Sequence, residues 1–83
     1  MSTKIINSKL VDIKNSAEFL ITSIKLIENH LGHKLSDSDE NLVLSIINEI
    51  EPSEFAGMTK KEMLVYAVNK SINKLITQNK NIN

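Results

Sequence analysis

Residues 44–62 read LSIINEIEPSEFAGMTKKE, and they contain the only proline and one of the two glycines of this 83-residue chain. The residue before a proline is pushed away from helical geometry, and glycine readily enters turns. Both kinds of helix breaker therefore gather in the segment PSEFAG. This stretch predicts a hinge between two helices, with Phe55 and Met58 filling the corner of the fold.

The helices on either side of this hinge have recognisable boundaries. Leucine, valine and isoleucine recur at helical spacing upstream and predict a helix over about residues 38–50, with Ser36 or Ser38 as its cap. Downstream, a T-x-x-E capping box begins at Thr59 and predicts a helix over about residues 59–77. We expect the Asn/Lys-rich segment that follows to be a flexible tail.

A long first helix is predicted over about residues 7–31. Apolar residues follow one another there at spacings of three and four, which places them on one stripe of the helix. Gly32 comes directly afterwards and would end the helix in the left-handed conformation. The stripe is a candidate core or dimer contact and consists of Leu10, Ile13, Ala17, Leu20, Ile24, Ile27 and Leu31.

This helix has more apolar surface than one neighbouring helix would cover. Four further apolar residues lie off the stripe, namely Val11, Phe19, Ile21 and Leu26. Short domains also bury a smaller fraction of their surface on folding than larger domains do, so that oligomerisation is an ordinary supplement to their stability. We therefore predict an all-α fold with one domain over residues 1–83. Its three helices would be antiparallel, with a long first helix, and the chain would form a homodimer.

The amino-acid composition limits where in the cell we expect the protein and which partners we expect it to bind. The chain has no cysteine, which excludes disulfides and thiolate metal sites. It has no apolar run long enough to span a bilayer and no apolar core of a signal peptide, so we expect a cytoplasmic protein without a membrane role. Ten basic residues balance ten acidic ones, and every basic residue is lysine. The absence of arginine disfavours specific readout of DNA bases.

The motifs of catalysis and cofactor binding are missing from this sequence. His30 and His33 flank Gly32, but zinc requires three or four ligands, so His30 is interpreted as a favourable charge at a helix end. The segment DSDEN lacks the glycine of a calcium loop and is interpreted as a helix start. With no phosphate loop and no paired nucleophile and base, the sequence predicts no enzyme, no metal and no cofactor.

Charge is unevenly distributed along the chain. Residues 36–57 contain six acidic residues and no lysine, whereas residues 58–83 contain five lysines and one glutamate. Such a difference is typical of solvated helix faces, and it also offers a lysine face for an acidic protein or for DNA phosphates. The candidate contacts are Lys60, Lys61, Lys70 and Lys74.

Three functions remain open on these grounds. The leading prediction is a small regulatory protein that acts by protein–protein interaction, because surplus apolar helix surface suits such a module. One alternative is a DNA-binding modulator of transcription that uses the turn at residues 52–57 within a helix-turn-helix. Another alternative is a phage- or plasmid-type inhibitor or antitoxin that binds a host protein.

Three segments carry a resemblance to a known family. NLVLSIINEIE (residues 41–51) and KKEMLVYAVNKSI (residues 60–72), together with SAEFLITSIKLIENHLGHKL (residues 16–35), resemble the AriR/YmgB family of small helical regulators. The resemblance covers about residues 16–73. It implies a helical homodimer that modulates biofilm and acid-resistance programmes through two-component signalling partners.

Overall fold

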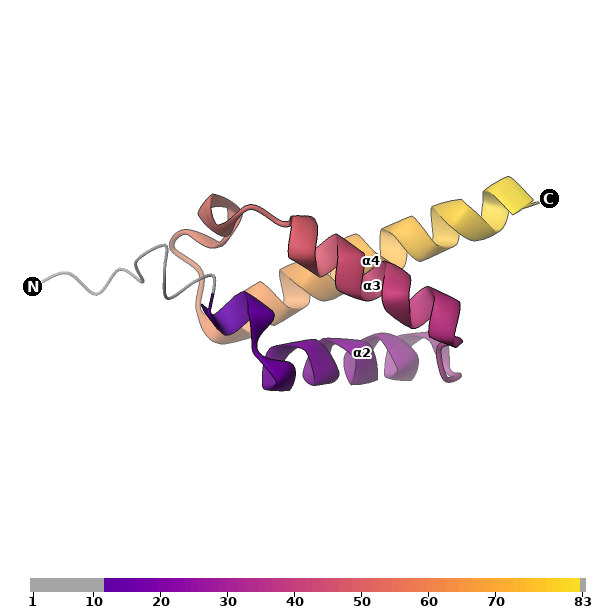
Figure 1. Cartoon of the computed structure of the whole chain (residues 1–83), viewed down its shortest axis with the longest axis horizontal. Coiled ribbons are helices and arrows are strands. Elements are labelled where there is room, and N and C mark those ends of the chain that lie inside the picture. Colours follow the sequence, from indigo (N-terminus) through magenta and orange to yellow (C-terminus); the bar gives the residue numbers. More distant parts are fainter. Residues whose placement is uncertain (1–11, 83) are drawn as a thin grey trace, which may run out of the picture.

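This computed structural model describes residues 12–82, with side chains to residue 78. In this range the secondary structure consists of helices joined by turns and loops. The absence of strands in this part of the chain confirms the predicted all-α class. A short helical segment, residues 12–15, comes first. The elements that follow are α2 (Ala17–Leu31), α3 (Asp37–Glu49), the 3-10 helix η1 (Pro52–Phe55) and α4 (Lys60–Ile82) (Figure 1).

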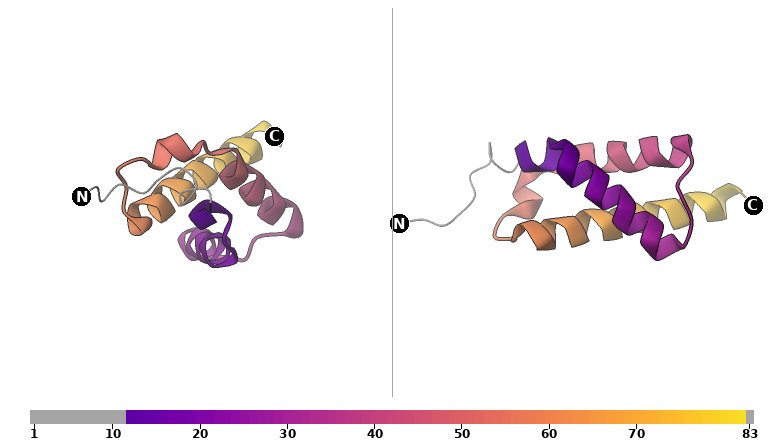
Figure 2. Two further views of the ribbon diagram at one scale, coloured as in Figure 1. Left: turned by 60° about the vertical axis from the view of Figure 1, so that its left-hand side comes forward. Right: turned by 90° about the horizontal axis from the view of Figure 1, so that it is seen from below.

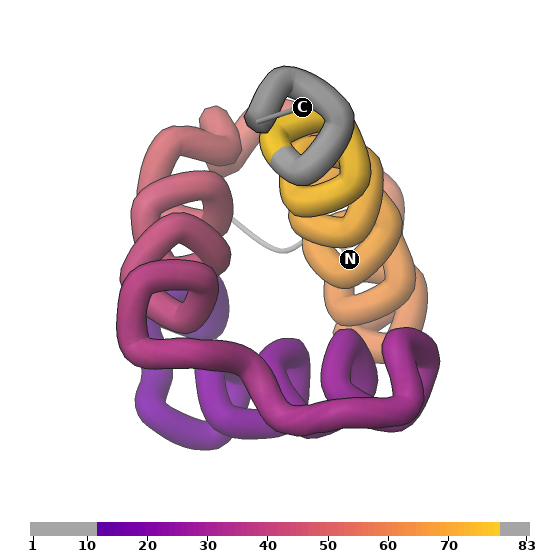
Figure 3. Tube along the Cα trace, turned by 90° about the vertical axis from the view of Figure 1, so that its right-hand side faces the viewer, coloured from indigo at the N-terminus to yellow at the C-terminus, as the bar shows by residue number. Residues whose placement is uncertain are grey.

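The α-helices α2, α3 and α4 enclose a common core. Each of them contacts the other two. Seen along the long axis of the molecule, they lie on three sides of one interior (Figure 3). Helix α2 crosses α3 and α4 obliquely (Figure 2). The antiparallel three-helix arrangement and the dimer expected from the sequence remain predictions.

The structure differs from the predicted first helix over residues 7–31, because the helix is interrupted at Ser16. Ser16 has an extended backbone, with φ −70° and ψ 146°. Its hydroxyl donates to the carbonyl oxygen of Ile13 at 2.9 Å and accepts from the amide of Phe19 at 3.1 Å. One serine therefore closes the short segment and caps α2, which is the competition with helical geometry that serine side chains offer.

The inner face of α2 also differs from the predicted stripe. Phe19, which we placed off the stripe, is only 1% exposed and lies in line with Ser23 and Ile27 at successive spacings of four. The ring of Phe19 packs edge-on against that of Phe55, with centroids 6.2 Å apart. Ser23 is tolerated inside because its hydroxyl donates to the carbonyl oxygen of Phe19 at 2.8 Å.

The corner between α3 and α4 is filled as predicted. Phe55 of η1 is completely buried, and Met58 is half-buried against the core. Burying a phenylalanine side chain stabilises a fold by roughly 1.5–3 kcal/mol. The core that Phe55 joins consists of Phe19, Ile27, Leu35, Val43, Ile47, Ile50, Phe55, Met63, Ala67, Val68, Ile72 and Leu75.

Three helix boundaries follow the local signals in the sequence. Gly32 adopts a left-handed conformation with φ 81°, and its amide donates to the carbonyl oxygen of Glu28. Ser36 caps α3 by accepting from the amide of Asp39 at 3.1 Å. Before α4, the hydroxyl of Thr59 accepts from the amide of Glu62, whose carboxylate accepts from the amide of Thr59.

Helix α4 continues to Ile82, beyond the predicted end at about Thr77 and into the segment expected to be a flexible tail. The physical reason is that no proline or glycine occurs in residues 60–82, so nothing in that sequence breaks the helix. The C-terminal part of α4 extends past the N-terminal start of α3 in Figure 1. Across the described residues 12–82, neither this helix nor any other combines the length and apolar character that crossing a membrane requires.

Candidate functional site

An apolar groove of about 370 Å³ lies at the start of α4, and we call it the α4 groove. Val65 on its wall is a large apolar side chain that is 50% exposed. Lys61 and Asn69 are one helical turn before and after Val65, so the three share one face of the helix. The groove is lined by Met58, Lys61, Glu62, Val65, Tyr66 and Asn69.

A second hollow, of about 340 Å³, lies between α2 and the start of α3, and we call it the α2–α3 hollow. Ile21 lies on its wall and is a large apolar side chain that is 55% exposed. The loop beneath is fixed because the carboxylate of Glu28 accepts from the amide of Leu35 at 2.9 Å. The lining residues are Ile21, Ile24, Lys25, Glu28, Lys34, Leu35 and Glu40.

The predicted stripe of the first helix lies mostly at the edge of the core. Ile27 is fully buried, Ala17 is exposed, and Leu10 falls outside the described residues. The other four members are half-buried and pack against the core: Ile13, Leu20, Ile24 and Leu31. One chain therefore already uses much of the stripe. The apolar surface of α2 that it leaves open includes Ile21 and Leu26, which is 40% exposed.

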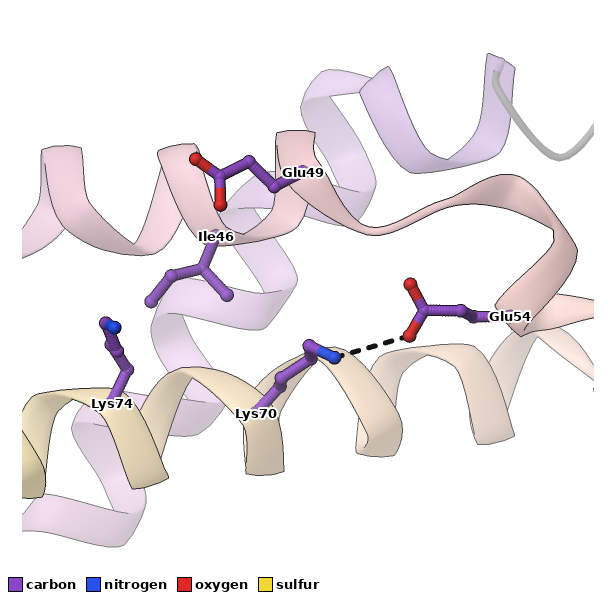
Figure 4. A pocket seen from close by; sticks show the side chains of 5 residues that line it. All are labelled: Ile46, Glu49, Glu54, Lys70 and Lys74. Atoms are coloured by element: carbon purple, nitrogen blue, oxygen red, sulfur yellow. Dashed lines mark hydrogen bonds and ion pairs between the residues drawn. The ribbon is translucent and has the colours of Figure 1, made fainter.

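A cluster of polar groups joins the hinge to α4. Glu54 of η1 accepts hydrogen bonds from the hydroxyl of Tyr66 and from the ammonium of Lys70, the latter at 3.3 Å. Its second oxygen accepts from the amide of Glu51 at 2.9 Å. Figure 4 shows the contact between Glu54 and Lys70 beside a hollow of about 310 Å³, which is lined by Ile46, Glu49, Glu54, Lys70 and Lys74.

These contacts keep both charged groups of the cluster ionised. The hydrogen bond from Tyr66, followed by that from the amide of Glu51, lowers the pKa of Glu54 from 4.5 to about 2. The hydrogen bond to Glu54 raises the pKa of Lys70. A carboxylate with so low a pKa does not serve as a proton donor near neutral pH, and a strongly protonated lysine does not serve as a nucleophile.

Of the four lysines proposed as partner or phosphate contacts, Lys70 and Lys74 share the hollow beside the hinge, and Lys61 lies on the α4 groove. Lys60 pairs with Glu18 of α2 at 3.1 Å, and Lys70 pairs with Glu54. Lys60 and Lys70 each face a carboxylate, and the DNA-binding alternative, which requires lysines that face phosphate, stays a prediction.

The two histidines lie at the end of α2, where the sequence placed them. His30 belongs to the last turn of the helix, and the ring Nδ1 of His33 hydrogen-bonds the carbonyl oxygen of Lys34 at 2.9 Å. Within residues 12–82, no three side chains of histidine, aspartate or glutamate come together in a way that could hold a metal ion.

Sequence reasoning missed Lys14. This lysine is only 6% exposed, and its ammonium donates to the carbonyl oxygens of Asn48 and Ile50, each at 2.9 Å. The last turn of α3 contains no basic residue, so the negative end of its dipole lacks a cation of its own. That deficiency was the one signal in the sequence that could have indicated a lysine from elsewhere.

Comparison with known proteins gives no family for this chain: no family model, no curated protein and no solved structure matches it. The resemblance to the AriR/YmgB family therefore remains a prediction from the three quoted helical segments. The proposal for the function of the chain therefore rests on its own α4 groove and α2–α3 hollow.

Proposed function

We propose that this chain is a small regulatory protein without enzymatic activity, an AriR-like modulator of signalling or transcription that acts by binding other proteins. The observation that carries the proposal is the α4 groove. Val65 is half-exposed on its wall, and the side chain of Met58 and the ring of Tyr66 line the same groove. Exposed apolar groups that share a groove are typical of surfaces that another protein covers.

The rim of the α4 groove supplies the polar part of such a surface. Lys61 and Glu62 carry opposite charges and follow one another at the start of the helix. The hydrogen bond from the amide of Thr59 holds the Glu62 carboxylate in place. An apolar centre with a charged rim is the arrangement in which a few central side chains supply most of the binding energy.

The polar cluster of the hinge supports a binding role rather than a catalytic one. The pKa of Glu54 is lowered to about 2, and that of Lys70 is raised. Neither group is therefore tuned toward neutral pH, as a general acid or base would be. Their contact ties η1 to α4, and Tyr66, whose hydroxyl also bonds Glu54, lines the α4 groove.

Self-association forms part of the proposal and is assigned to the side of α2. Ile21 is more than half exposed, and it lies beside Ile24 of the predicted stripe in the α2–α3 hollow. The solution mass by light scattering, measured over a concentration series, tests this assignment. We expect a dimer that Ile21→Asp converts to a monomer while the helical content stays unchanged. A chain that is monomeric over the whole series would refute self-association.

Affinity capture from cell extract tests the proposal for the α4 groove. Bait carrying Val65→Asp should lose proteins that the unchanged bait retains, because binding would bury a charge without a partner. The matched control is Asn73→Asp, which introduces the same charge at another exposed position of α4. Capture of the same proteins by all three baits would contradict a binding role for the groove.

A further inference from the structure

Residues 12–15, which we call the strap, are held to the end of α3 by the buried ammonium group of Lys14. The strap is a single helical turn that ends at Ser16, and Asp12 and Asn15 on it are exposed. Its two inward residues have different roles, because Ile13 packs on the core and Lys14 is buried. The Lys14 ammonium provides the side-chain hydrogen bonds that we find between the strap and the end of α3, whereas the Ser16 hydroxyl donates to the carbonyl oxygen of Ile13 at the boundary with α2.

The bonds made by Lys14 satisfy a need of α3. The last carbonyl groups of a helix have no partners within the helix and carry partial negative charge. Asn48 and Ile50 present two such carbonyls. The C-cap residue of α3 is Ile50, whose backbone is extended, with φ −65° and ψ 124°, and so α3 does not end in the left-handed conformation of a glycine cap. Lys14 therefore replaces the cap that the sequence of α3 lacks.

The break at Ser16 makes the strap separable from α2. The Ser16 hydroxyl caps α2 whether or not the strap is in place, because its bond to the Phe19 amide lies within the start of α2. Release of the strap thus leaves α2 intact. It removes the cation from the end of α3 and takes Ile13 away from the core.

We infer that the strap is a conformational latch: Lys14 fastens residues 12–15 over the end of α3, and its release uncovers the part of the core that Ile13 covers. The closed state has the two hydrogen bonds that the Lys14 ammonium donates and the packing of Ile13 on the core, and the released state lacks both. A molecule that prefers the uncovered surface would shift the balance toward the released state.

The chain contains no cysteine, so a single spin label can be attached at Asp12→Cys in the strap or, as a reference, at Asn29→Cys on the exposed side of α2. Each label is combined with Lys14→Met, which keeps the length of the side chain but not its charge, and with Lys14→Arg, which keeps the charge. Electron paramagnetic resonance then reports the mobility of each site.

We expect Lys14→Met to convert the label at position 12 from an immobile to a mobile spectrum, while the label at position 29 is unchanged and the protein still unfolds cooperatively. Lys14→Arg should restore the immobile spectrum. Lys14→Met should also increase the fluorescence of a dye that binds apolar surface. An immobile label at position 12 in Lys14→Met, mobilisation of both sites together, or a released strap without a gain in dye fluorescence would each overturn the latch.

Discussion

The carboxylate of Glu54 and the ammonium of Lys70 lie 3.3 Å apart, and this contact links η1 to the middle of α4 across the hinge. Lys70 also lies over the ring of Tyr66, with its ammonium 5.4 Å from the ring centroid. The ring of Tyr66 in turn packs edge-on against Phe55, with centroids 5.9 Å apart. The polar cluster and the aromatic corner of the core therefore meet in one place.

Glu54 should make stability depend on pH in a defined range. Its pKa is lowered from 4.5 to about 2 in the folded protein, so the folded state favours the ionised form. This contribution is fully present above pH 4.5 and is lost as the pH falls from 4.5 toward 2. Urea unfolding across this range should show a smaller loss of stability for Glu54→Gln than for the unchanged protein. Equal losses would show that Glu54 is not held ionised.

Phe55 should be among the most sensitive positions of the core. Replacing a buried phenylalanine with alanine removes apolar contacts and leaves a cavity, at a typical cost of about 3–5 kcal/mol. We expect Phe55→Ala to lower the free energy of unfolding in urea by that amount. Val65→Ala is the control, since half of that side chain is exposed and its loss should cost much less. Similar costs at the two positions would argue against Phe55 as the centre of the corner.

The two glycines should respond alike to substitution by alanine. Gly32 and Gly57 both have φ 81°, and a Cβ added at either would meet no atom within 4 Å. The cost therefore comes from the left-handed backbone alone, which amounts to about 1–2 kcal/mol for a residue with a side chain. Thermal unfolding should show comparable destabilisation for Gly32→Ala and Gly57→Ala. A neutral result at one site would mean that its backbone is not held in this conformation.

The ion pair between Lys60 and Glu18 should contribute little. Both side chains are more than half exposed, at 56% and 77%, and such pairs are weakened by solvent and salt. We expect Lys60→Gln to change the free energy of unfolding by less than about 1 kcal/mol, and less still at high salt. A larger, salt-independent effect would show that the pair closes α2 onto α4.

Local signals in the sequence predicted the corners of this fold better than its faces. Gly32, Ser36 and the Thr59–Glu62 pair act within a few residues, so their spacing was enough to place the helix boundaries. The burial of Phe19 depends on the position of Phe55 across the fold, which no local periodicity contains. The burial of Lys14 depends on carbonyls 34 and 36 residues away.

The candidate surfaces were only partly predictable for the same reason. The pattern indicated that α2 has surplus apolar residues, and Ile21 and Leu26 are indeed exposed. It did not distinguish them from Phe19, because burial is decided by which face of α2 meets α4. Nor did the pattern indicate that Val65 of α4 is half exposed and lines the α4 groove.

The two buried serines bear on how the helices can move relative to one another. Ser23 bonds to the carbonyl oxygen of Phe19, and Ser71 bonds to that of Ala67, so each serine is committed to its own helix. The contacts between helices inside the described core are therefore apolar, and their register is set by how the side chains pack. The side-chain hydrogen bonds that join different segments are found near the ends of the helices and in the hinge, and they are made by Lys14, Glu28 and Glu54. Small sliding of α2 along α4 breaks no buried hydrogen bond, whereas opening of a corner breaks at least one.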